Sequence, residues 1–289
     1  MKIPPDLAHT LAVAVEHGSL EGAAKALHAT QSAVSQRLQT LERLTGQVLL
    51  VRSRPVRATA AGDVVIRFAR QVAHLDGDAA AALGLHTPQR ASIAIGVNAD
   101  SLATWFLAPL ARLASQHHVT FDLYRDDEDR TADLLANGTV AAAVTTRRDP
   151  VPGCTVTPLG VVTYGAVAAE KFAAQWFGHG ASAEALAQAP VVDLDHHDTL
   201  QTRYLEAVGV DPMLPPRHRI PASADFVRAI ALGLGWGVLP RIQRESLTGA
   251  VDLGGPTVSV PLFWQQWRVH SDLLGHVATE IAAEAARSL

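Results

Sequence analysis

The sequence contains a single cysteine, Cys154, among its 289 residues. One thiol cannot form an internal disulfide, and it cannot supply a metal site that is built from several thiolates. We expect Cys154 to be a small packed residue rather than a nucleophile. Disulfide frameworks and cysteine-rich zinc sites are therefore excluded.

The sequence also lacks any apolar run close to the roughly 20 residues that a membrane-spanning helix needs. Its first ten residues, MKIPPDLAHT, lack the charged-then-apolar order of a secretory signal. We therefore expect a cytoplasmic chain with no membrane partner. The length leaves room for two or three compact units.

Positive charge is scarce overall but concentrated near the N-terminus. The first 90 residues hold ten Lys and Arg against seven Asp and Glu, whereas the remaining 199 hold 14 against 21. Between His17 and Arg70 the excess rises to eight basic against three acidic residues. A local basic patch of this kind attracts a polyanion such as DNA.

Three short helices are expected within this basic region. Apolar residues recur at helical spacing from Leu7 to Val15, and the pattern stops at Gly18. A second helix is expected over SLEGAAKAL, capped by Ser19, and a third begins after Thr30 as its N-cap. The predicted buried stripe of this third helix is Ala33, Val34, Leu38, Leu41 and Leu44.

The other residues of the third helix are polar and face away from that core. Gln can pair with adenine and Arg with guanine through two hydrogen bonds, each good pair giving about 1–3 kcal/mol of discrimination. Two short helices separated by a tight turn form a helix-turn-helix. The residues predicted to read base edges are Thr30, Gln31, Ser32, Ser35, Gln36 and Arg37.

The residues after Gly46 predict a two-stranded wing, in which QVLLVR is one strand and SRPVRAT returns as the other. Arg52, Arg54 and Arg57 would lie on this wing, where basic residues suit phosphate or minor-groove contact. An isolated polar helix face is most often simply solvated. Here the capped helix, its Gln, Ser and Arg face, the basic wing and the local positive charge together favour DNA binding.

These residues also carry a family resemblance. The stretch GSLEGAAKALHATQSAVSQRLQTLERLTGQVLLVR, followed by RATAAG, resembles the winged helix-turn-helix of LysR-type transcriptional regulators. Ser32 stands where many members have proline, yet TQSAVSQR is similar to the ArgP/LysG-type branch, the regulators of basic amino acid export. NADSLATWF, DPVPGC, AGDVVI and GLGWGVLP extend this similarity over nearly the whole chain. The resemblance implies a homodimer or homotetramer that binds double-stranded promoter DNA and responds to a small effector, with RNA polymerase as a further candidate partner.

A long helix is expected over residues 60–84, which contain no proline. Its apolar residues approximate a heptad seam. Such a helix could pair with a second copy and place two DNA-reading units about 34 Å apart. Packing against its own domain is the alternative, and we favour pairing. The predicted seam is Val64, Phe68, Val72, Leu75, Ala79 and Ala82.

From residue 91 the pattern changes to alternating strands and helices, with SIAIGV, VTFDLYRD and VAAAVTT as strands. This alternation predicts an α/β fold with a largely parallel sheet covered by helices. The resemblance implies a two-lobed, periplasmic-binding-protein-like effector domain. The expected boundaries are 1–59 for the winged helix-turn-helix domain, 60–84 for the linker helix and 91–289 for the effector domain, with lobe I at about 91–163 and 267–289 and lobe II at about 164–266.

Polar residues at strand ends are candidate effector ligands, because ligands of such sheets lie beyond the carboxyl ends of strands. Asp100 or Ser101 would begin a helix whose backbone N–H groups suit a carboxylate, and Thr145 and Thr146 would play a similar polar role. The resemblance makes lysine or arginine the leading effector hypothesis, and its cationic side chain needs acids. The candidate acids are Asp126, Asp127, Asp195 and Asp225.

Signals of enzymatic activity are weaker. DLDHHD, from Asp193 to Asp198, contains the Asp-His-His string of a class of metal-dependent phosphoesterases, but no convincing set of further Asp and His ligands accompanies it. GLGWGVLP is not G-x-G-x-x-G, and its glycines suit a tight turn and close packing before a strand. We therefore predict an allosteric regulator with no catalytic residue, metal or cofactor. The alternative is a small-molecule-binding protein or metal-dependent hydrolase whose N-terminal domain serves for oligomerisation.

Overall fold

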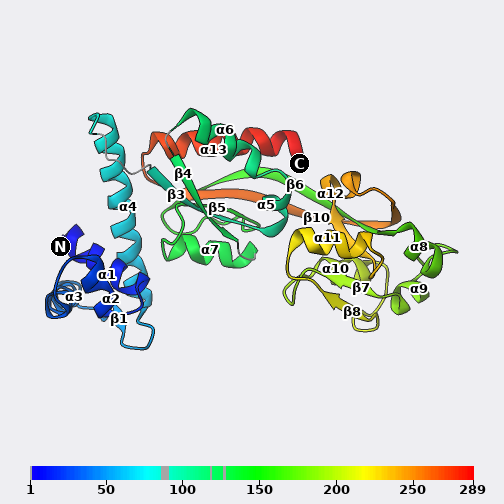
Figure 1. The fold of residues 1–289 in the computed structure, drawn as a ribbon, viewed down its shortest axis with the longest axis horizontal. Helices are drawn as coiled ribbons and strands as arrows, with labels where there is room; N and C mark the ends of the chain where they lie inside the picture. Colours follow the sequence, from blue (N-terminus) through cyan, green and yellow to red (C-terminus); the bar gives the residue numbers. More distant parts are fainter. Residues whose placement is uncertain (1, 86–90, 118, 126–127) are drawn as a thin grey trace.

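Three parts follow one another along the chain in the computed structural model, which describes residues 2–85, 91–117, 119–125 and 128–289. Figure 1 shows a small helical domain at the N-terminus, one long helix beside it, and an elongated region of two lobes beyond that helix. Asp126 and Asp127, two of the predicted effector ligands, lie outside the described residues. Within the described ranges, no helix is both long and apolar enough to cross a membrane.

The N-terminal domain contains the predicted helices, which are α1 (Pro5–Glu16), α2 (Leu20–Ala26) and α3 (Gln31–Thr45). Both predicted N-caps are confirmed, because the Ser19 side chain accepts a hydrogen bond from the backbone N–H of Gly22, and Thr30 accepts one from that of Ala33. These bonds satisfy backbone donors that the first turn of a helix leaves without a partner. Gly46 ends α3 in the left-handed conformation, with φ of 65°.

The predicted buried stripe of α3 is confirmed at its centre and wrong at its end. Val34, Leu38 and Leu41 are buried, whereas Leu44 is 41% exposed. With about 3.6 residues per turn, the stripe continues at Thr45 rather than at Leu44. Ala33, beside the stripe, is only partly buried.

The wing is present, with strands shorter than predicted. They are β1 (Leu50–Val51) and β2 (Arg57–Ala58), paired antiparallel with Leu50 opposite Ala58. The ladder is short because the backbone N–H of Val56 donates to the carbonyl oxygen of Gly18, 2.9 Å away, instead of to the facing strand. The wing loop is thereby tied to the turn between α1 and α2.

The linker helix α4 (Ala60–Ala82) follows directly. It buries Val65, Ile66 and Ala69 in the core of the N-terminal domain. Three residues of the predicted seam are exposed: Val64 at 55%, Leu75 at 41%, and Ala79. Phe68 and Val72 are partly buried. The side chain of Ala82, at the end of that seam, lies outside the described part of the molecule.

Lobe I contains the parallel strands of the predicted α/β fold. β3 lies between β4 and β5 and is parallel to both, with Val97 opposite Arg125 and Gly96 opposite Ala143. The elements of this lobe are β3 (Ala91–Val97), α5 (Ala99–Thr104), α6 (Leu107–Gln116), β4 (Val119–Arg125), α7 (Glu128–Ala136), β5 (Ala142–Thr145) and, at the end of the chain, α13 (Asp272–Ser288).

Two long strands, β6 (Cys154–Ala169) and β10 (Ala250–Trp267), run antiparallel to each other through both lobes (Figure 1). β10 also pairs antiparallel with β5. The main sheet, in the order β4-β3-β5-β10-β6-β9, is therefore mixed, and the prediction of a largely parallel sheet is wrong beyond β5. The physical reason is the return of β10 from the far end of the chain, a long-range pairing that no local pattern reveals.

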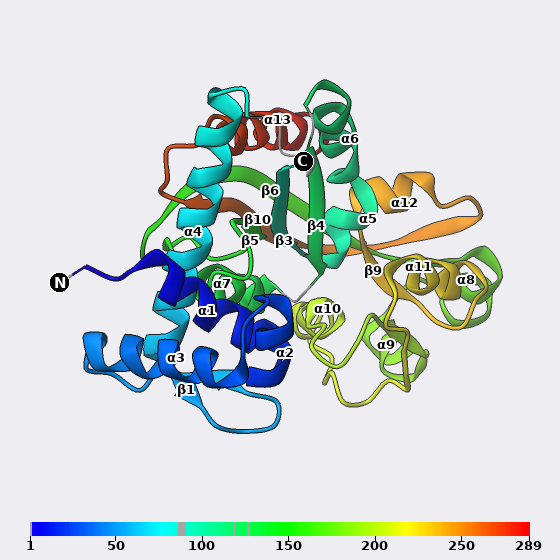
Figure 2. The same cartoon turned by 60° about the vertical axis from the view of Figure 1, so that its left-hand side comes forward.

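Lobe II surrounds the far ends of β6 and β10 (Figures 1 and 2). In GLGWGVLP, Gly233 has φ of 81°, and a Cβ on Gly235 would lie 2.6 Å from the carbonyl oxygen of Pro190, so the predicted tight turn and close packing are confirmed. The elements of this lobe are α8 (Glu170–Trp176), α9 (Ala183–Gln188), β7 (Val191–Asp193), α10 (Leu200–Ala207), β8 (Arg217–Arg219), α11 (Ser223–Ala231), β9 (Gly237–Pro240) and α12 (Arg241–Ser246).

Candidate DNA-binding surface and effector site

The N-terminal half of α3 presents polar side chains to solvent. Gln31, Gln36 and Arg37 are exposed, and none of their side chains hydrogen-bonds to another described residue. Thr30 and Ser32 are also exposed, but their hydroxyls lie 3.0 Å apart and Thr30 caps the helix. The amides of Gln31 and Gln36 and the guanidinium of Arg37 are therefore the groups most free to contact base edges. The hydroxyls of Thr30, Ser32 and the half-buried Ser35 are less free to do so.

The wing adds positive charge to the same end of the domain. Arg52, Arg54 and Arg57 are all exposed. Figures 1 and 2 both place α3 and the wing at the end of the domain away from the sheet of lobe I. A polar helix face flanked by exposed guanidinium groups is the arrangement that reads a groove while contacting phosphates.

The carboxyl ends of the parallel strands meet at one edge of the lobe I sheet, as the α/β pattern predicts. Arg125, which ends β4, donates to the carbonyl oxygen of Pro221 in lobe II, 3.4 Å away, so this edge faces the second lobe. Thr145, which ends β5, is buried, and its hydroxyl accepts a hydrogen bond from the backbone N–H of Arg147. Thr146 is half-buried beside it.

Asp100, near the start of α5, has the most strongly perturbed carboxyl group of this edge. The pKa of Asp100 is raised to about 6, and burial is the largest cause. The nearby charge of Asp198 also raises this pKa, whereas a hydrogen bond from Tyr164 lowers it. The Tyr164 hydroxyl lies 2.9 Å from Oδ2 of Asp100. Next to it, the buried hydroxyl of Ser101 has no hydrogen-bond partner among the described residues.

Asp198 approaches the same place from lobe II, in the loop before α10. Its carboxylate accepts hydrogen bonds from the backbone N–H groups of Leu194 and Leu200, at 2.9 and 3.0 Å. Burial raises the pKa of Asp198 in spite of these bonds. Over the ranges that the structure describes, no Lys, Arg or His forms an ion pair with Asp100 or Asp198, so two interacting acids lack a cation.

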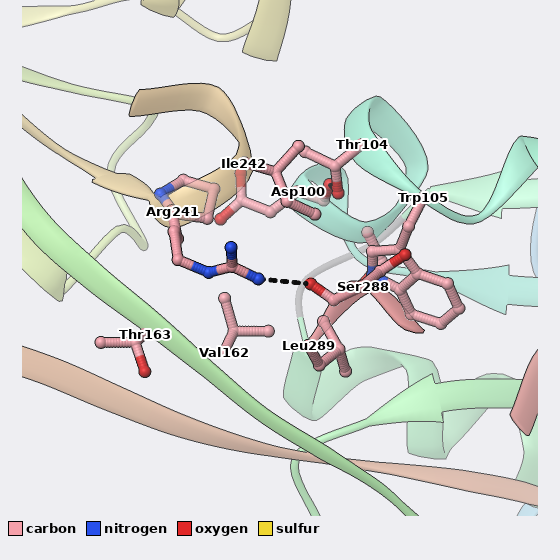
Figure 3. Close-up of a pocket in the computed structure, with 11 residues that line it drawn as sticks. Asp100, Thr104, Trp105, Val162, Thr163, Arg241, Ile242, Ser288 and Leu289 are labelled. Atoms are coloured by element: carbon pink, nitrogen blue, oxygen red, sulfur yellow. Dashed lines mark hydrogen bonds between the residues drawn. The ribbon is translucent and has the colours of Figure 1, made fainter. Parts of the chain in front are cut away.

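A cavity of about 180 Å³ adjoins Asp100. It joins α5 of lobe I to α12 of lobe II, and the guanidinium of Arg241 reaches across to the carbonyl oxygen of Ser288, 3.3 Å away (Figure 3). The cavity therefore offers both a carboxylate and a guanidinium. Its other lining residues are Ser101, Thr104, Trp105, Val162, Thr163, Pro240, Ile242 and Leu289.

Two of the predicted acids have other surroundings. Oδ1 of Asp195 accepts hydrogen bonds from the backbone N–H groups of His197 and Asp198, so this carboxylate shapes its own loop. Asp225 is exposed in the first turn of α11. Neither shares the buried setting of Asp100.

The Asp-His-His segment has a structural role in the fold. Asp193 is buried, and both of its carboxylate oxygens accept hydrogen bonds from Nη1 of Arg217, at 2.7 and 2.8 Å. Among the described residues, no three His, Cys, Asp or Glu side chains are grouped to hold a metal ion.

Sequence reasoning missed Asp198 and Tyr164 as candidate site residues. Asp198 is the last residue of the DLDHHD string, which the sequence suggests only as a possible metal-binding segment and not as part of an effector site. Tyr164 lies within β6, and an aromatic residue in an apolar strand gives no signal of its own.

Two family models together cover most of the chain. The model described as "Bacterial regulatory helix-turn-helix protein, lysR family" matches residues 5–63, the part that holds α1 to α3 and the wing. The model described as "LysR substrate binding domain" matches residues 86–274, which include both lobes.

Known proteins are similar over nearly the whole length. The chain is 38% identical over 284 residues to the "Lysine export transcriptional regulatory protein LysG" of Corynebacterium efficiens, covering 96% of both chains. The crystal structure of ArgP from Mycobacterium tuberculosis has a TM-score of 0.91 at 39% identity and covers 99% of this chain and 98% of its own. Full-length LysG from Corynebacterium glutamicum with the bound effector Arg has a TM-score of 0.83 at 33% identity and covers 99% of both. The chain belongs to the LysR family of DNA-binding transcription regulators, and its relatives include those named LysG and ArgP.

Proposed function

We propose that this regulator responds to lysine or arginine and controls a gene for a basic amino acid exporter. The observation that carries the effector assignment is the pair of acids, Asp100 in lobe I and Asp198 in lobe II. The pKa of each is raised chiefly by burial, the charge of Asp198 raises that of Asp100 further, and neither acid has a cationic partner among the described residues. The relatives named for lysine export and for a bound Arg effector support the same class of ligand.

A cationic side chain between these two acids would relieve their repulsion and form charge-assisted hydrogen bonds with both. Because one acid belongs to each lobe, the ligand would hold the lobes together. Its carboxylate would be met by Arg241 or by the Ser101 hydroxyl, both of which line the adjoining cavity. A ligand that carried only a cationic group or only a carboxylate would pair with the two acids or with Arg241 and Ser101, but not with both sets.

On the DNA side, two N-terminal domains would bind the promoter as a pair. Gln31, Gln36 and Arg37 would supply base readout, supported by Thr30, Ser32 and Ser35, while the arginines of the wing would supply salt-sensitive attraction. The protein would act by allostery rather than by catalysis, as a dimer or tetramer in the cytoplasm where the promoter lies, with RNA polymerase as a candidate partner. A coupling of about 1–3 kcal/mol between effector and DNA would suffice.

The test measures binding of the purified protein to its own upstream intergenic DNA at two salt concentrations, with lysine or arginine present or absent. Norleucine and citrulline are matched controls, since norleucine keeps the carbon chain of lysine, citrulline keeps the shape of arginine, and both lack the positive side-chain charge. Specific, salt-weakened binding that changes with lysine or arginine and not with the neutral analogues is the expected result. DNA binding that ignores all four ligands would refute the effector assignment and leave the regulator.

The same titrations with Asp100→Asn and Asp198→Asn test the site itself. Each substitution removes a negative charge and keeps a polar side chain of the same shape. We expect each to abolish the response to the cationic amino acid while DNA binding without effector is retained. A normal response in both variants would place the ligand elsewhere.

A further inference from the structure

The linker helix α4 has three distinct faces. One face, with Val65, Ile66 and Ala69, packs in the core of the N-terminal domain. Successive residues of a helix are about 100° apart, so Arg67, Arg70 and His74 lie on a second face and the apolar seam that begins at Val64 lies on a third. The second face meets lobe I of the same chain, beside which α4 stands in both Figures 1 and 2.

The contacts of the second face are directional. Nη1 of Arg67 donates to the carbonyl oxygen of Pro152 at 2.9 Å, and Nε2 of His74 lies 2.9 Å from the hydroxyl of Ser271. The His74 ring also meets Trp267 edge-on, with ring centroids 6.5 Å apart. Arg70 adds a long hydrogen bond of 3.4 Å to the hydroxyl of Thr139.

The backbone of lobe I is shaped to receive Arg67. A Cβ on Gly138, whose φ is 76°, would lie 2.6 Å from the Cα of Arg67, so only a residue without a side chain allows this approach. The close fit at Gly138 and the three polar contacts define a docking surface that joins the DNA-binding part to lobe I. We call this set of contacts, made by Arg67, Arg70 and His74, the α4 latch.

The latch connects to the candidate effector site through one loop, residues 146–153, here called the relay loop. It begins where β5 ends, at the edge of the sheet where the parallel strands of lobe I end, and reaches Arg67 at Pro152. The side chain of Gln265, fully buried, clamps it by donating to the carbonyl oxygens of Arg147 and Asp149 at 3.0 Å and accepting from the N–H of Val151 at 2.8 Å. One buried side chain therefore ties three backbone positions of the relay loop together.

We infer that the relay loop and the α4 latch carry the effector signal from the interlobe cleft to the DNA-binding domain within one chain. This inference rests on the proposed function, because it requires an effector in the cleft. A displacement of the strand end at Thr146 reaches Pro152 through the clamped loop and there changes the seat of Arg67, which sets the orientation of α4 on lobe I. Chains of packed side chains and hydrogen-bond networks of this kind can carry energetic coupling between distant sites.

The experiment uses the full-length protein and compares DNA affinity with and without saturating arginine. The ratio of the two affinities is the coupling factor. We expect the double variant Arg67→Ala/His74→Ala to reduce this factor at least fivefold toward 1, while its affinity for arginine in the absence of DNA stays within twofold of the parent. Arg67→Lys, which keeps a donor for Pro152, is expected to restore part of it, and Gln265→Met, which releases the relay loop, is expected to lose it.

Asp76→Ala is the matched control, because Asp76 lies on the exposed part of the same helix. A coupling factor equal to that of the parent protein in both the double variant and Gln265→Met would overturn the inference. If arginine does not bind the parent protein at all, the proposed function fails instead, and the latch is then tested without effector. Amide hydrogen exchange in residues 137–140 and 146–153 must rise in the double variant, and unchanged exchange there would overturn the latch.

Discussion

We expect the protonation state of Asp100 to control binding of the proposed cationic effector. Because burial raises its pKa to about 6 in the free protein, this carboxyl is mostly ionised at pH 7 and mostly protonated at pH 5. Only the ionised form attracts a cation, so we expect the affinity for arginine to fall about tenfold from pH 7 to pH 5, as the ionised fraction falls. Asp198, whose pKa is also raised, acts in the same direction.

Isothermal titration calorimetry across this pH range measures the effect. Asp100→Asn serves as the control, since its weaker binding must depend less on pH. An affinity of the parent protein that stays constant from pH 5 to pH 7 would contradict the role of Asp100 as the cation's partner.

Asp193 and Arg217 form a buried ion pair whose purpose is structural. Removing one partner leaves the other charge buried without compensation, so we expect Asp193→Ala to lower the free energy of unfolding by about 3–5 kcal/mol. Urea unfolding measures this change. The same experiment with EDTA separates the ion pair from the metal-site alternative, because a chelator should leave the stability of the parent protein unchanged, and a clear loss would revive a metal at this segment.

We expect the wing arginines to contribute to DNA binding as a group, through their charge rather than through the geometry of any single contact. Each phosphate contact releases counterions, so removing one arginine is expected to weaken DNA binding and to reduce the slope of log affinity against log salt by about 1. Arg52→Ala, Arg54→Ala and Arg57→Ala are compared by fluorescence anisotropy on specific and random DNA. The exposed Lys171 in lobe II provides the charge-matched control, Lys171→Ala, whose slope must equal that of the parent. Unchanged slopes in all three arginine variants would remove the wing from the DNA interface.

Helix α4 offers a paired test of packing, because it contains two glycines with opposite surroundings. A Cβ on Gly62 would overlap the carbonyl oxygen of Leu49, whereas a Cβ on Gly77 would meet nothing within 4 Å. We expect Gly62→Ala to destabilise the protein by about 2–4 kcal/mol through overpacking, and Gly77→Ala to stabilise it by about 0.5–1 kcal/mol through helix propensity. Thermal unfolding measures both, and equal effects of the two substitutions would contradict the close packing of α4 on the wing.

Local elements were predictable from the sequence, and contacts between distant segments were not. The caps at Ser19 and Thr30 and the stop at Gly18 depend on neighbouring residues, and these boundaries were predicted correctly. The antiparallel pairing of β10 with β5 joins segments more than 100 residues apart. The alternation of strands and helices along the sequence does not predict this pairing. The meeting of Asp100 with Asp198 depends on that same arrangement of lobes, so the sequence indicated Asp100 as a candidate but not its partner.

In the whole molecule, the third face of α4 is only partly covered by the described part of the chain, because Phe68 packs against the N-terminal core whereas Val64 and Leu75 remain exposed. Val64 and Leu75 expose apolar surface on a helix whose other faces are occupied, and a second copy of the same helix would bury both. We expect Val64→Glu/Leu75→Glu to convert the parent oligomer to a smaller species in analytical ultracentrifugation, because burying the introduced carboxylates in the seam is unfavourable.

The separated chains should retain binding to a single half-site, since α3 and the wing are intact, and should lose the added affinity for two half-sites about 34 Å apart. Asp76→Ala, on the same helix but outside the seam, must sediment as the parent does. If the glutamate variant keeps the parent's sedimentation coefficient, α4 does not pair, and the two DNA-reading units must be brought together by the effector domains.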